Sequence, residues 1–168
     1  YYSKNANNKD RVFNVIYEPL AESTLKADGG LKIKNIVDET GKRIRGEKTG
    51  EESPGTPQRD VFDISFISAT GSERTGFSTQ KPEALLEKII YAASNKNDLV
   101  ADFFIGSGTT ISIAEKLGRQ WIGCDFSKTA IQIARNRLVD RDVKPFLVEN
   151  IGNYQRNIIY LYGGRIYE

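Results

Sequence analysis

The sequence contains no histidine, a single cysteine and no methionine. Without histidine, the chain lacks both the imidazole ligands of many zinc sites and the base of a histidine-based catalytic triad. Because the lone Cys124 cannot form a disulfide within the chain, we expect a reducing, cytoplasmic location. The chain begins with Tyr1 and Tyr2, so we expect it to be a fragment that continues upstream.

Long apolar runs and a strong net charge are also absent. No apolar run approaches the ~20 residues that a membrane helix needs, so we expect no membrane partner. The net charge of +2 neither demands nor excludes a polyanionic partner. A length of 168 residues with 39% hydrophobic and 27% charged residues is typical of one globular domain.

From Lys81 onward the hydrophobic pattern alternates between helical and strand periods. We expect a buried strand over 99–104 and further strands over 120–125 and 145–148, with helices over 82–95, over 109–117 and after Ser127. Pro82 suits the start of the first helix, Gly118 the end of the second, and Ser127 is an N-cap residue for the third. This order of elements predicts an α/β fold with a parallel sheet. Glycines and prolines break the stretch before Lys81 into short pieces, which we interpret as an insert.

A glycine-containing turn, Asp102 to Thr110, follows the first strand of this pattern. Glycines at the end of a parallel strand let a ligand approach the backbone, and the next helix N-terminus offers free N–H groups. Asp125 ends the following strand, where a carboxylate can accept both hydroxyl hydrogens of a ribose. A structural turn with a surface aspartate is the alternative, but the joint spacing favours a ligand that contains a nucleoside.

The spacing of the glycines narrows the class of nucleoside. A dinucleotide fingerprint has a third glycine where this chain has Ile111, so NAD is disfavoured. Neither Gly106 nor Gly108 is followed by the Lys-Ser or Lys-Thr pair of a phosphate-binding loop.

Three motifs resemble those of the DNA amino-methyltransferases, which bind S-adenosylmethionine on a Rossmann-like sheet. Asp102 to Thr110 is similar to Asp-Pro-Phe-x-Gly-Ser-Gly-Thr-Thr, residues 79–82 to Thr-Gln-Lys-Pro, and residues 118–125 to Gly-Arg-x-Trp-Ile-Gly-x-Asp. The resemblance is strong from Thr75 to Leu138. It is weaker over residues 2–4 and 56–62.

This resemblance implies an α/β fold that is part of a Rossmann-like methyltransferase sheet, with an irregular, target-recognition-like segment before it. In that family Asp125 would hold the cofactor ribose and Lys81 would face its carboxylate. Phe103 stands where the family has proline and Ile105 where it has a smaller residue, which we expect to tighten the loop without abolishing binding. The implied cofactor-binding residues are Thr79, Lys81, Asp102, Phe104, Gly106, Ser107, Gly108, Thr109, Asp125 and Ser127.

The family's catalytic motif, Asp/Asn/Ser-Pro-Pro-Tyr/Phe/Trp, is missing, because no two of the five prolines are adjacent. We therefore expect no catalytic residue in this chain. In the permuted members of the family that motif lies upstream, so truncation explains the gap. Cytosine-C5 chemistry is disfavoured too, since Gly123 and not proline precedes Cys124.

The resemblance also implies a division of the chain. Residues 1–24 would be a trailing strand of the upstream catalytic half, 25–76 a target-recognition-like insert, and 77–168 the cofactor-binding half. Seven Lys and Arg against four Asp and Glu lie between Lys26 and Lys48, a mild basic cluster. We expect Lys42, Arg43 and Arg45 to contact DNA, although a solvated loop explains the composition equally well.

Taken with the resemblance, these patterns predict part of an enzyme that methylates the exocyclic amino group of adenine or cytosine in double-stranded DNA, within a restriction-modification system. A homodimer and a restriction subunit are further candidate partners. One alternative is a cofactor-binding scaffold that acts with a catalytic partner. Methylation of RNA or protein is another, which the target-recognition-like segment disfavours.

Overall fold

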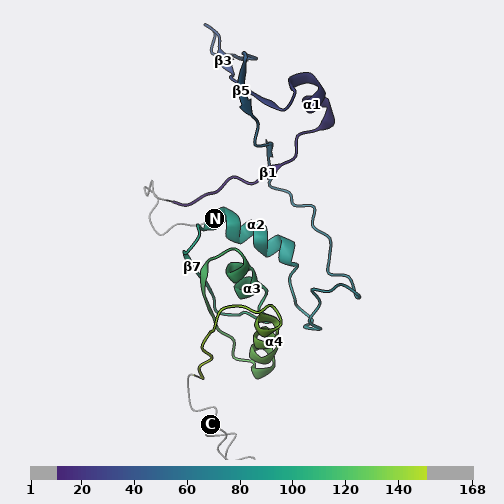
Figure 1. The fold of residues 1–168 in the computed structure, drawn as a ribbon, viewed down its shortest axis with the longest axis vertical. Helices are drawn as coiled ribbons and strands as arrows, with labels where there is room; N and C mark the ends of the chain where they lie inside the picture. The colour runs from purple at the N-terminus through teal and green to yellow at the C-terminus, as the bar shows by residue number, and fades with distance from the viewer. Residues whose placement is uncertain (1–10, 151–168) are drawn as a thin grey trace, which may run out of the picture.

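The computed structural model describes residues 11–150, which form two regions (Figure 1). Residues 17–57 fold as paired short strands with one helix beside them. Residues 83–139 fold as helices against a parallel strand pair, and an irregular segment connects the two regions. No helix among residues 11–150 is long and apolar enough to cross a membrane.

The second region has mixed α/β structure, as predicted. Strands β7 (Leu99–Asp102) and β8 (Gln120–Gly123) are parallel and are connected by helix α3 (Thr109–Lys116). Helices α2 (Glu83–Ala93) and α4 (Lys128–Val139) both contact α3. This arrangement is one βαβ unit with a helix on either side of its crossover helix.

The buried hydrophobic side chains of the described chain all belong to this α/β region. All of them except Ala130 form two clusters, and Trp121 packs against both. One cluster contains Ile105, Ile111, Ala134 and Leu138; the other contains Ile90, Ile113 and Ala114. Because these residues come from the turn after β7 and from three helices, the same packing that stabilises the region also fixes the glycine turn.

The predicted helix boundaries are confirmed with small shifts. The Ser127 hydroxyl accepts a hydrogen bond from the Ala130 N–H at 3.4 Å and so caps α4, as its position before the apolar pattern indicated. Gly118 follows α3 in the left-handed conformation, which terminates that helix. Helix α2 begins at Glu83, whose N–H donates to the Glu73 carboxylate at 3.0 Å.

Two predictions about strands are wrong. Residues 145–148 form no strand: Pro145 has no N–H to donate to a ladder, and Phe146 packs on Trp121 with ring centroids 5.8 Å apart. The first strand is also not buried, since Leu99 is 57% exposed. Among residues 11–150, β7 pairs only with β8, so its outer edge has no strand beside it.

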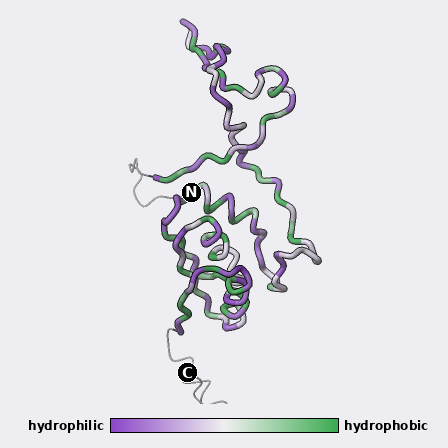
Figure 2. The backbone as a smooth tube through the Cα atoms, viewed as in Figure 1, coloured by the Kyte–Doolittle hydropathy of each residue, from purple (hydrophilic) through white to green (hydrophobic). Residues whose placement is uncertain are grey.

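The first region consists of three antiparallel strand pairs and helix α1 (Glu22–Asp28). The pairs are β1 (Tyr17–Glu18) with β6 (Thr56–Pro57), β2 (Leu31–Ile33) with β5 (Lys48–Glu52), and β3 (Ile36–Val37) with β4 (Arg43–Ile44). Apart from the trailing strand expected within residues 1–24, the sequence predicted no element here, because the strands are too short to show a period. Figure 2 shows apolar and polar residues mixed along this region.

Asn14 connects the start of the described chain to the end of α2. Its backbone N–H donates to the Ala92 carbonyl at 2.9 Å, and its side-chain amide donates to the carbonyls of Tyr91 and Ser94, each at 2.9 Å. The last carbonyls of a helix have no partner within the helix, so these bonds satisfy groups that water would otherwise solvate. The segment before β1 is thereby held against the α/β region.

Gly108 and Gly118 allow a matched test of how closely the turn packs on α4. Both have a left-handed backbone, with φ of 75° and 72°. A Cβ on Gly108 would lie 2.7 Å from the Ala134 Cβ, whereas a Cβ on Gly118 would meet only the flexible Lys96 side chain at 3.4 Å.

We expect Gly118→Ala to cost about 1 kcal/mol of unfolding free energy from backbone strain, and Gly108→Ala about 2 to 4 kcal/mol because α4 must also move. Urea unfolding of the two variants measures this difference. Equal costs would show that Gly108 is not in close contact with α4.

Candidate functional site

The parallel pairing of β7 and β8 brings the glycine turn and Asp125 to the same edge of the strand pair. Asp102 is in register with Gly123 at the carboxyl ends of the two strands. The ladder continues past both strands, since the Ile105 N–H donates to the Cys124 carbonyl at 3.0 Å. The two parts of the predicted nucleoside site therefore lie side by side.

Asp125 is hydrogen-bonded on both carboxylate oxygens. Oδ2 accepts from the Gly106 N–H at 2.9 Å, and Oδ1 accepts from the Ser127 N–H at 2.9 Å. These two donors come from the turn after β7 and from the cap of α4, so they fix the carboxylate between the two segments. A carboxylate oxygen carries two lone pairs, which leaves capacity on each oxygen for a ligand hydroxyl.

The Asp102 carboxylate accepts two hydrogen bonds from residues of the glycine turn. Its Oδ1 accepts from the Phe104 N–H at 3.0 Å, and its Oδ2 accepts from the Thr110 hydroxyl at 2.6 Å. The turn then passes through Gly106, whose φ of 50° lies in the left-handed region that favours glycine. The Asp102 carboxylate thus connects the end of β7 to the first turn of α3.

A cavity of about 180 Å³ opens between this turn and the segment before α2. It is lined by Thr79, Lys81, Leu86, Asp102, Phe104, Ile105, Gly106, Ser107, Thr109 and Thr110. Seven of the ten residues predicted to bind the cofactor are in this lining. The structure thus gathers residues that are up to 31 positions apart along the chain, from Thr79 to Thr110.

The other three predicted residues lie behind or beside the cavity. Gly108 packs against α4, and Ser127 caps that helix. Asp125 accepts a hydrogen bond from the N–H of Gly106, which lines the cavity. Sequence reasoning missed three lining residues: Leu86, Ile105 and Thr110. Ile105 and Thr110 belong to the glycine motif itself, so the motif carried a signal for them.

The segment that carries Thr79 and Lys81 is shaped by Gln80. The Gln80 side-chain oxygen accepts from the N–H and the hydroxyl of Thr75 at 2.8 and 2.7 Å, and its amide nitrogen donates to the Glu73 carbonyl at 2.6 Å. The Gln80 side chain is thus bonded to residues 73 and 75. Lys81, the next residue, lines the cavity, and its ammonium donates to the Thr79 carbonyl at 3.3 Å.

A partly buried ion pair lies behind the cavity. Arg137 of α4 is 6% exposed and donates to the Glu83 carboxylate at 2.5 Å; Arg141 pairs with the same oxygen. Burial by itself would raise the pKa of Glu83, but the hydrogen bond from Arg137 and the charges of both arginines hold it below its usual range. No sequence motif pointed to Arg137, although its place beside Leu138 on the apolar face of α4 was a signal.

Exposed aromatic side chains follow both strands of the pair. Phe104, after β7, is 88% exposed and also lines the cavity, and Phe126, after β8, is 93% exposed. They place apolar area at the edge where the glycine turn and Asp125 meet.

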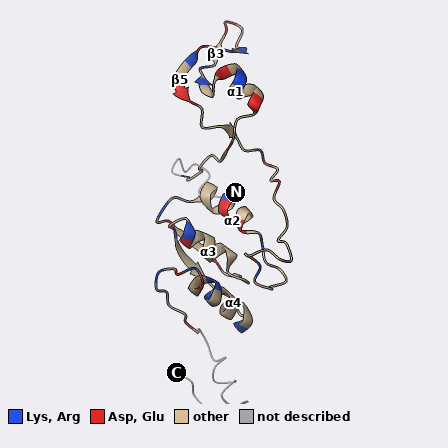
Figure 3. Cartoon of the chain, turned by 45° about the vertical axis from the view of Figure 1, so that its right-hand side comes forward, with Lys and Arg blue, Asp and Glu red and all other residues tan. Residues whose placement is uncertain are grey.

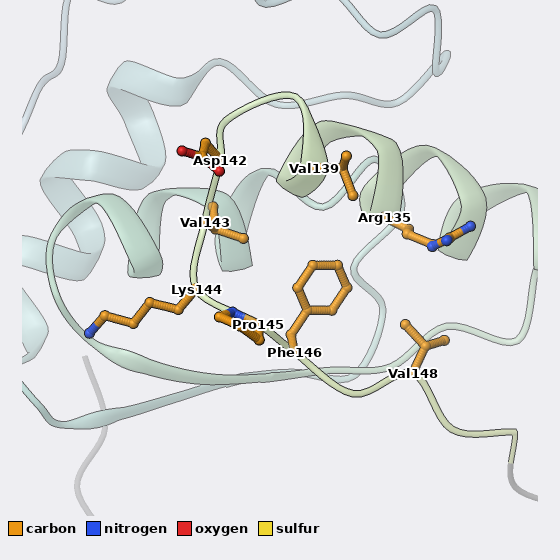
Figure 4. A pocket seen from close by; sticks show the side chains of 8 residues that line it. All are labelled: Arg135, Val139, Asp142, Val143, Lys144, Pro145, Phe146 and Val148. Atoms are coloured by element: carbon orange, nitrogen blue, oxygen red, sulfur yellow. The ribbon is translucent and has the colours of Figure 1, made fainter.

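A larger, more open cavity of about 510 Å³ lies between α4 and residues 142–148 (Figure 4). Its walls include Val139, Val143, Pro145 and Phe146, with Arg135 at its border. None of the predicted site residues lines it. We regard the smaller cavity as the functional candidate, because polar groups from the glycine turn and from the segment before α2 converge on it. No cluster of acidic or cysteine side chains able to hold a metal ion occurs among residues 11–150.

The predicted DNA-binding residues belong to the hairpin formed by β3 and β4 and to the residue after it. Lys42 and Arg43 are exposed, whereas Arg45 pairs with the nearly buried Asp28 of α1. The Asp38 carboxylate closes the hairpin: the Thr40 hydroxyl and the Lys42 N–H donate to it and hold its pKa below the usual range. Figure 3 shows stretches of the backbone coloured for acidic as well as for basic residues in this region, so its charge is mixed.

Comparison with known proteins shows the family of the chain. A family described as DNA methylase, for N6 and N4 methylation, matches residues 1–136, or 136 of the 168 residues. The type II methyltransferase M2.LlaDCHI of Lactococcus lactis subsp. cremoris is 41% identical over 88 residues, which are 52% of this chain and 33% of that protein. The type II methyltransferase M2.DpnII of Streptococcus pneumoniae is 42% identical over the same length, with the same coverage.

Among solved structures, the complex of M1.HpyAVI with SAM is 48% identical over 36% of this chain and 31% of that chain, with a TM-score of 0.35. The aligned part of this chain spans about a third of the length of the two type II methyltransferases. Since the family match covers far more than half of the sequence, the chain belongs to the N6/N4 DNA methylase family.

Proposed function

We propose that this chain is the S-adenosylmethionine-binding part of a DNA methyltransferase that modifies adenine N6 or cytosine N4. The observation that carries the proposal is the hydrogen bond from the Gly106 N–H to Asp125, because it unites the glycine turn and the acid into one site. Family membership and the type II methyltransferases among the relatives support the activity.

The cofactor would occupy the small cavity and extend across the strand ends. Asp125 would accept the two ribose hydroxyls, since a fixed carboxylate is the usual acceptor for a vicinal diol. Lys81, together with the N-terminus of α3, would attract the negatively charged carboxylate of the methionine moiety. Asp102, Phe104 and the Gly106 to Thr109 backbone would line the methionine side.

When bound, the cofactor supplies an electrophilic methyl group. The exocyclic amine of a base is a weak nucleophile, because its lone pair is delocalised into the ring, so an acceptor must take its hydrogen bonds as the methyl group arrives. The family uses a Pro-Pro motif for this purpose, and the sequence has no adjacent prolines. We propose that the acceptor comes from a part of the protein outside this sequence.

On this proposal the α/β region is one portion of a Rossmann-like methyltransferase sheet. The domain division at residues 24 and 76 follows from it: the strand pairs of residues 25–76 would recognise the target, and residues 77–168 would bind the cofactor. Double-stranded DNA is the proposed substrate, in a restriction-modification system like those implied by the names of the relatives. A homodimer, a restriction subunit and a cytoplasmic location stay predictions.

A second candidate is a scaffold that binds the cofactor and acts with a catalytic partner. The missing Pro-Pro motif favours it. Methyl transfer to DNA by the full-length protein in the absence of any partner would eliminate this alternative.

Binding of S-adenosylmethionine to the full-length protein tests the main proposal. We expect Asp125→Asn to raise the Kd at least tenfold, on the order of 1.4 kcal/mol or more, since the amide accepts fewer hydrogen bonds and carries no charge. Asp98→Asn is the matched control: Asp98 lies just before β7, at the end away from the glycine turn, and its carboxylate accepts from the Asn95 N–H at 2.7 Å.

Isothermal titration calorimetry gives both constants. Absence of binding by the wild-type protein, or an equal Kd for Asp125→Asn and the wild type, would contradict the proposed site.

The DNA-binding hairpin has its own test. We expect the triple variant Lys42→Gln, Arg43→Gln, Arg45→Gln to weaken binding to nonspecific duplex DNA and to reduce the slope of log K against log salt by about 2, roughly 0.9 for each phosphate contact of Lys42 and Arg43, since Arg45 is already paired with Asp28. Lys32→Gln is the control, because the Lys32 ammonium is already paired with Glu51 at 2.8 Å. An unchanged salt slope for the triple variant would remove this region from the DNA interface.

A further inference from the structure

Arg137 is a charged residue on the apolar face of a helix. Its side chain is 4% exposed, and its neighbours along α4 on that face are Ala134 and Leu138, each 2% exposed. Burying a guanidinium costs several kcal/mol unless specific partners compensate for the lost water. The partners of Arg137 therefore indicate what the residue does.

Its first set of partners belongs to the glycine turn. Nη1 of Arg137 donates to the Thr109 hydroxyl at 2.9 Å and to the Ser107 carbonyl at 3.3 Å. Ser107 and Thr109 both line the small cavity and are themselves nearly buried. Arg137 thus holds one wall of the cavity from behind.

Its second partner belongs to the opposite wall. Nη2 of Arg137 donates to Glu83, the first residue of α2, which is separated by Pro82 from Lys81 of the cavity lining. The Thr109 hydroxyl, which accepts from Arg137, donates in turn to the Lys81 carbonyl at 3.4 Å. The two guanidinium nitrogens consequently reach both walls, a geometry that a planar fork of donors can provide and a lysine ammonium cannot.

We propose that Arg137 is a positioning residue for the cofactor, which sets the width of the cavity by bridging the glycine turn to the start of α2. The inference rests on the proposed function, since it assumes that S-adenosylmethionine occupies this cavity. Arg137 itself does not line the cavity; it acts through Ser107, Thr109 and Glu83.

Two other arginines make matched controls. Arg141 pairs with the same Glu83 oxygen, but its side chain is 34% exposed and it makes no bond to the glycine turn among the described contacts. Arg119 is 9% exposed and bonds to the Ser94 carbonyl at 2.6 Å and the Leu117 carbonyl at 2.7 Å, at the end of α2 away from the cavity. Replacing Arg141 removes an ion pair with Glu83 and leaves the bridge in place. Replacing Arg119 removes a buried arginine that has no part in the bridge.

The experiment measures the S-adenosylmethionine Kd by calorimetry and the Tm by thermal unfolding, both on the full-length protein. We expect Arg137→Gln to raise the Kd about tenfold or more, Arg141→Gln less than about twofold, and Arg119→Gln to lower the Tm while leaving the Kd within about twofold. Arg137→Lys should give an intermediate Kd, since one ammonium can keep the Glu83 pair but not the bridge.

If Arg137→Gln does not fold, Glu83→Gln replaces it, because that variant removes the counter-charge and keeps the packing. Its Kd should rise about fivefold or more. Without a carboxylate at position 83, the Arg137 guanidinium loses its ion pair with α2, so the α2 end of the bridge is weakened.

The outcomes separate the two proposals. No binding by the wild-type protein would overturn the proposed function itself. Wild-type binding with an unchanged Kd for Arg137→Gln, or for its substitute Glu83→Gln, would overturn only the positioning role. An equal rise in Kd for Arg119→Gln and Arg137→Gln would also overturn it, because the effect would then come from general destabilisation.

Discussion

The hydrogen bond between the Gly106 N–H and the Asp125 carboxylate joins the two halves of the site, and most other features of the α/β region maintain it. Parallel pairing of β7 with β8 brings the donor and the acceptor to the same edge. The cap at Ser127 then orients the carboxylate from the other side. A displacement of either strand by one residue would separate the two groups, since strand residues advance by about 3.3 Å.

The same contacts serve stability and binding in this region. Ile105 and Ile111 belong to the larger hydrophobic cluster, and the residues between them form the turn that lines the cavity. A turn whose two ends are anchored in the core keeps its backbone N–H groups in place before a ligand arrives. Such preorganisation lowers the entropy that binding has to overcome.

Local signals in the sequence predicted much of this region. The N-cap Ser127, the terminating Gly118 and the glycine turn each act over a few residues, so a single sequence reveals them. The failed strand at 145–148 and the half-exposed β7 depend on which segments are neighbours in space, and apolar composition does not encode that. Arg137 is a similar case: its partners Glu83 and Thr109 are 54 and 28 positions away along the chain.

The outer edge of β7 has a consequence for handling the protein. Within residues 11–150 its backbone N–H and carbonyl groups face no ladder partner, and the exposed Leu99 lies at the start of the strand. An uncovered strand edge is a template for pairing with any extended segment, including the same edge of another copy. A preparation of this portion by itself would therefore be prone to self-association, and a covering segment would improve its solubility while extending the sheet beside the cavity.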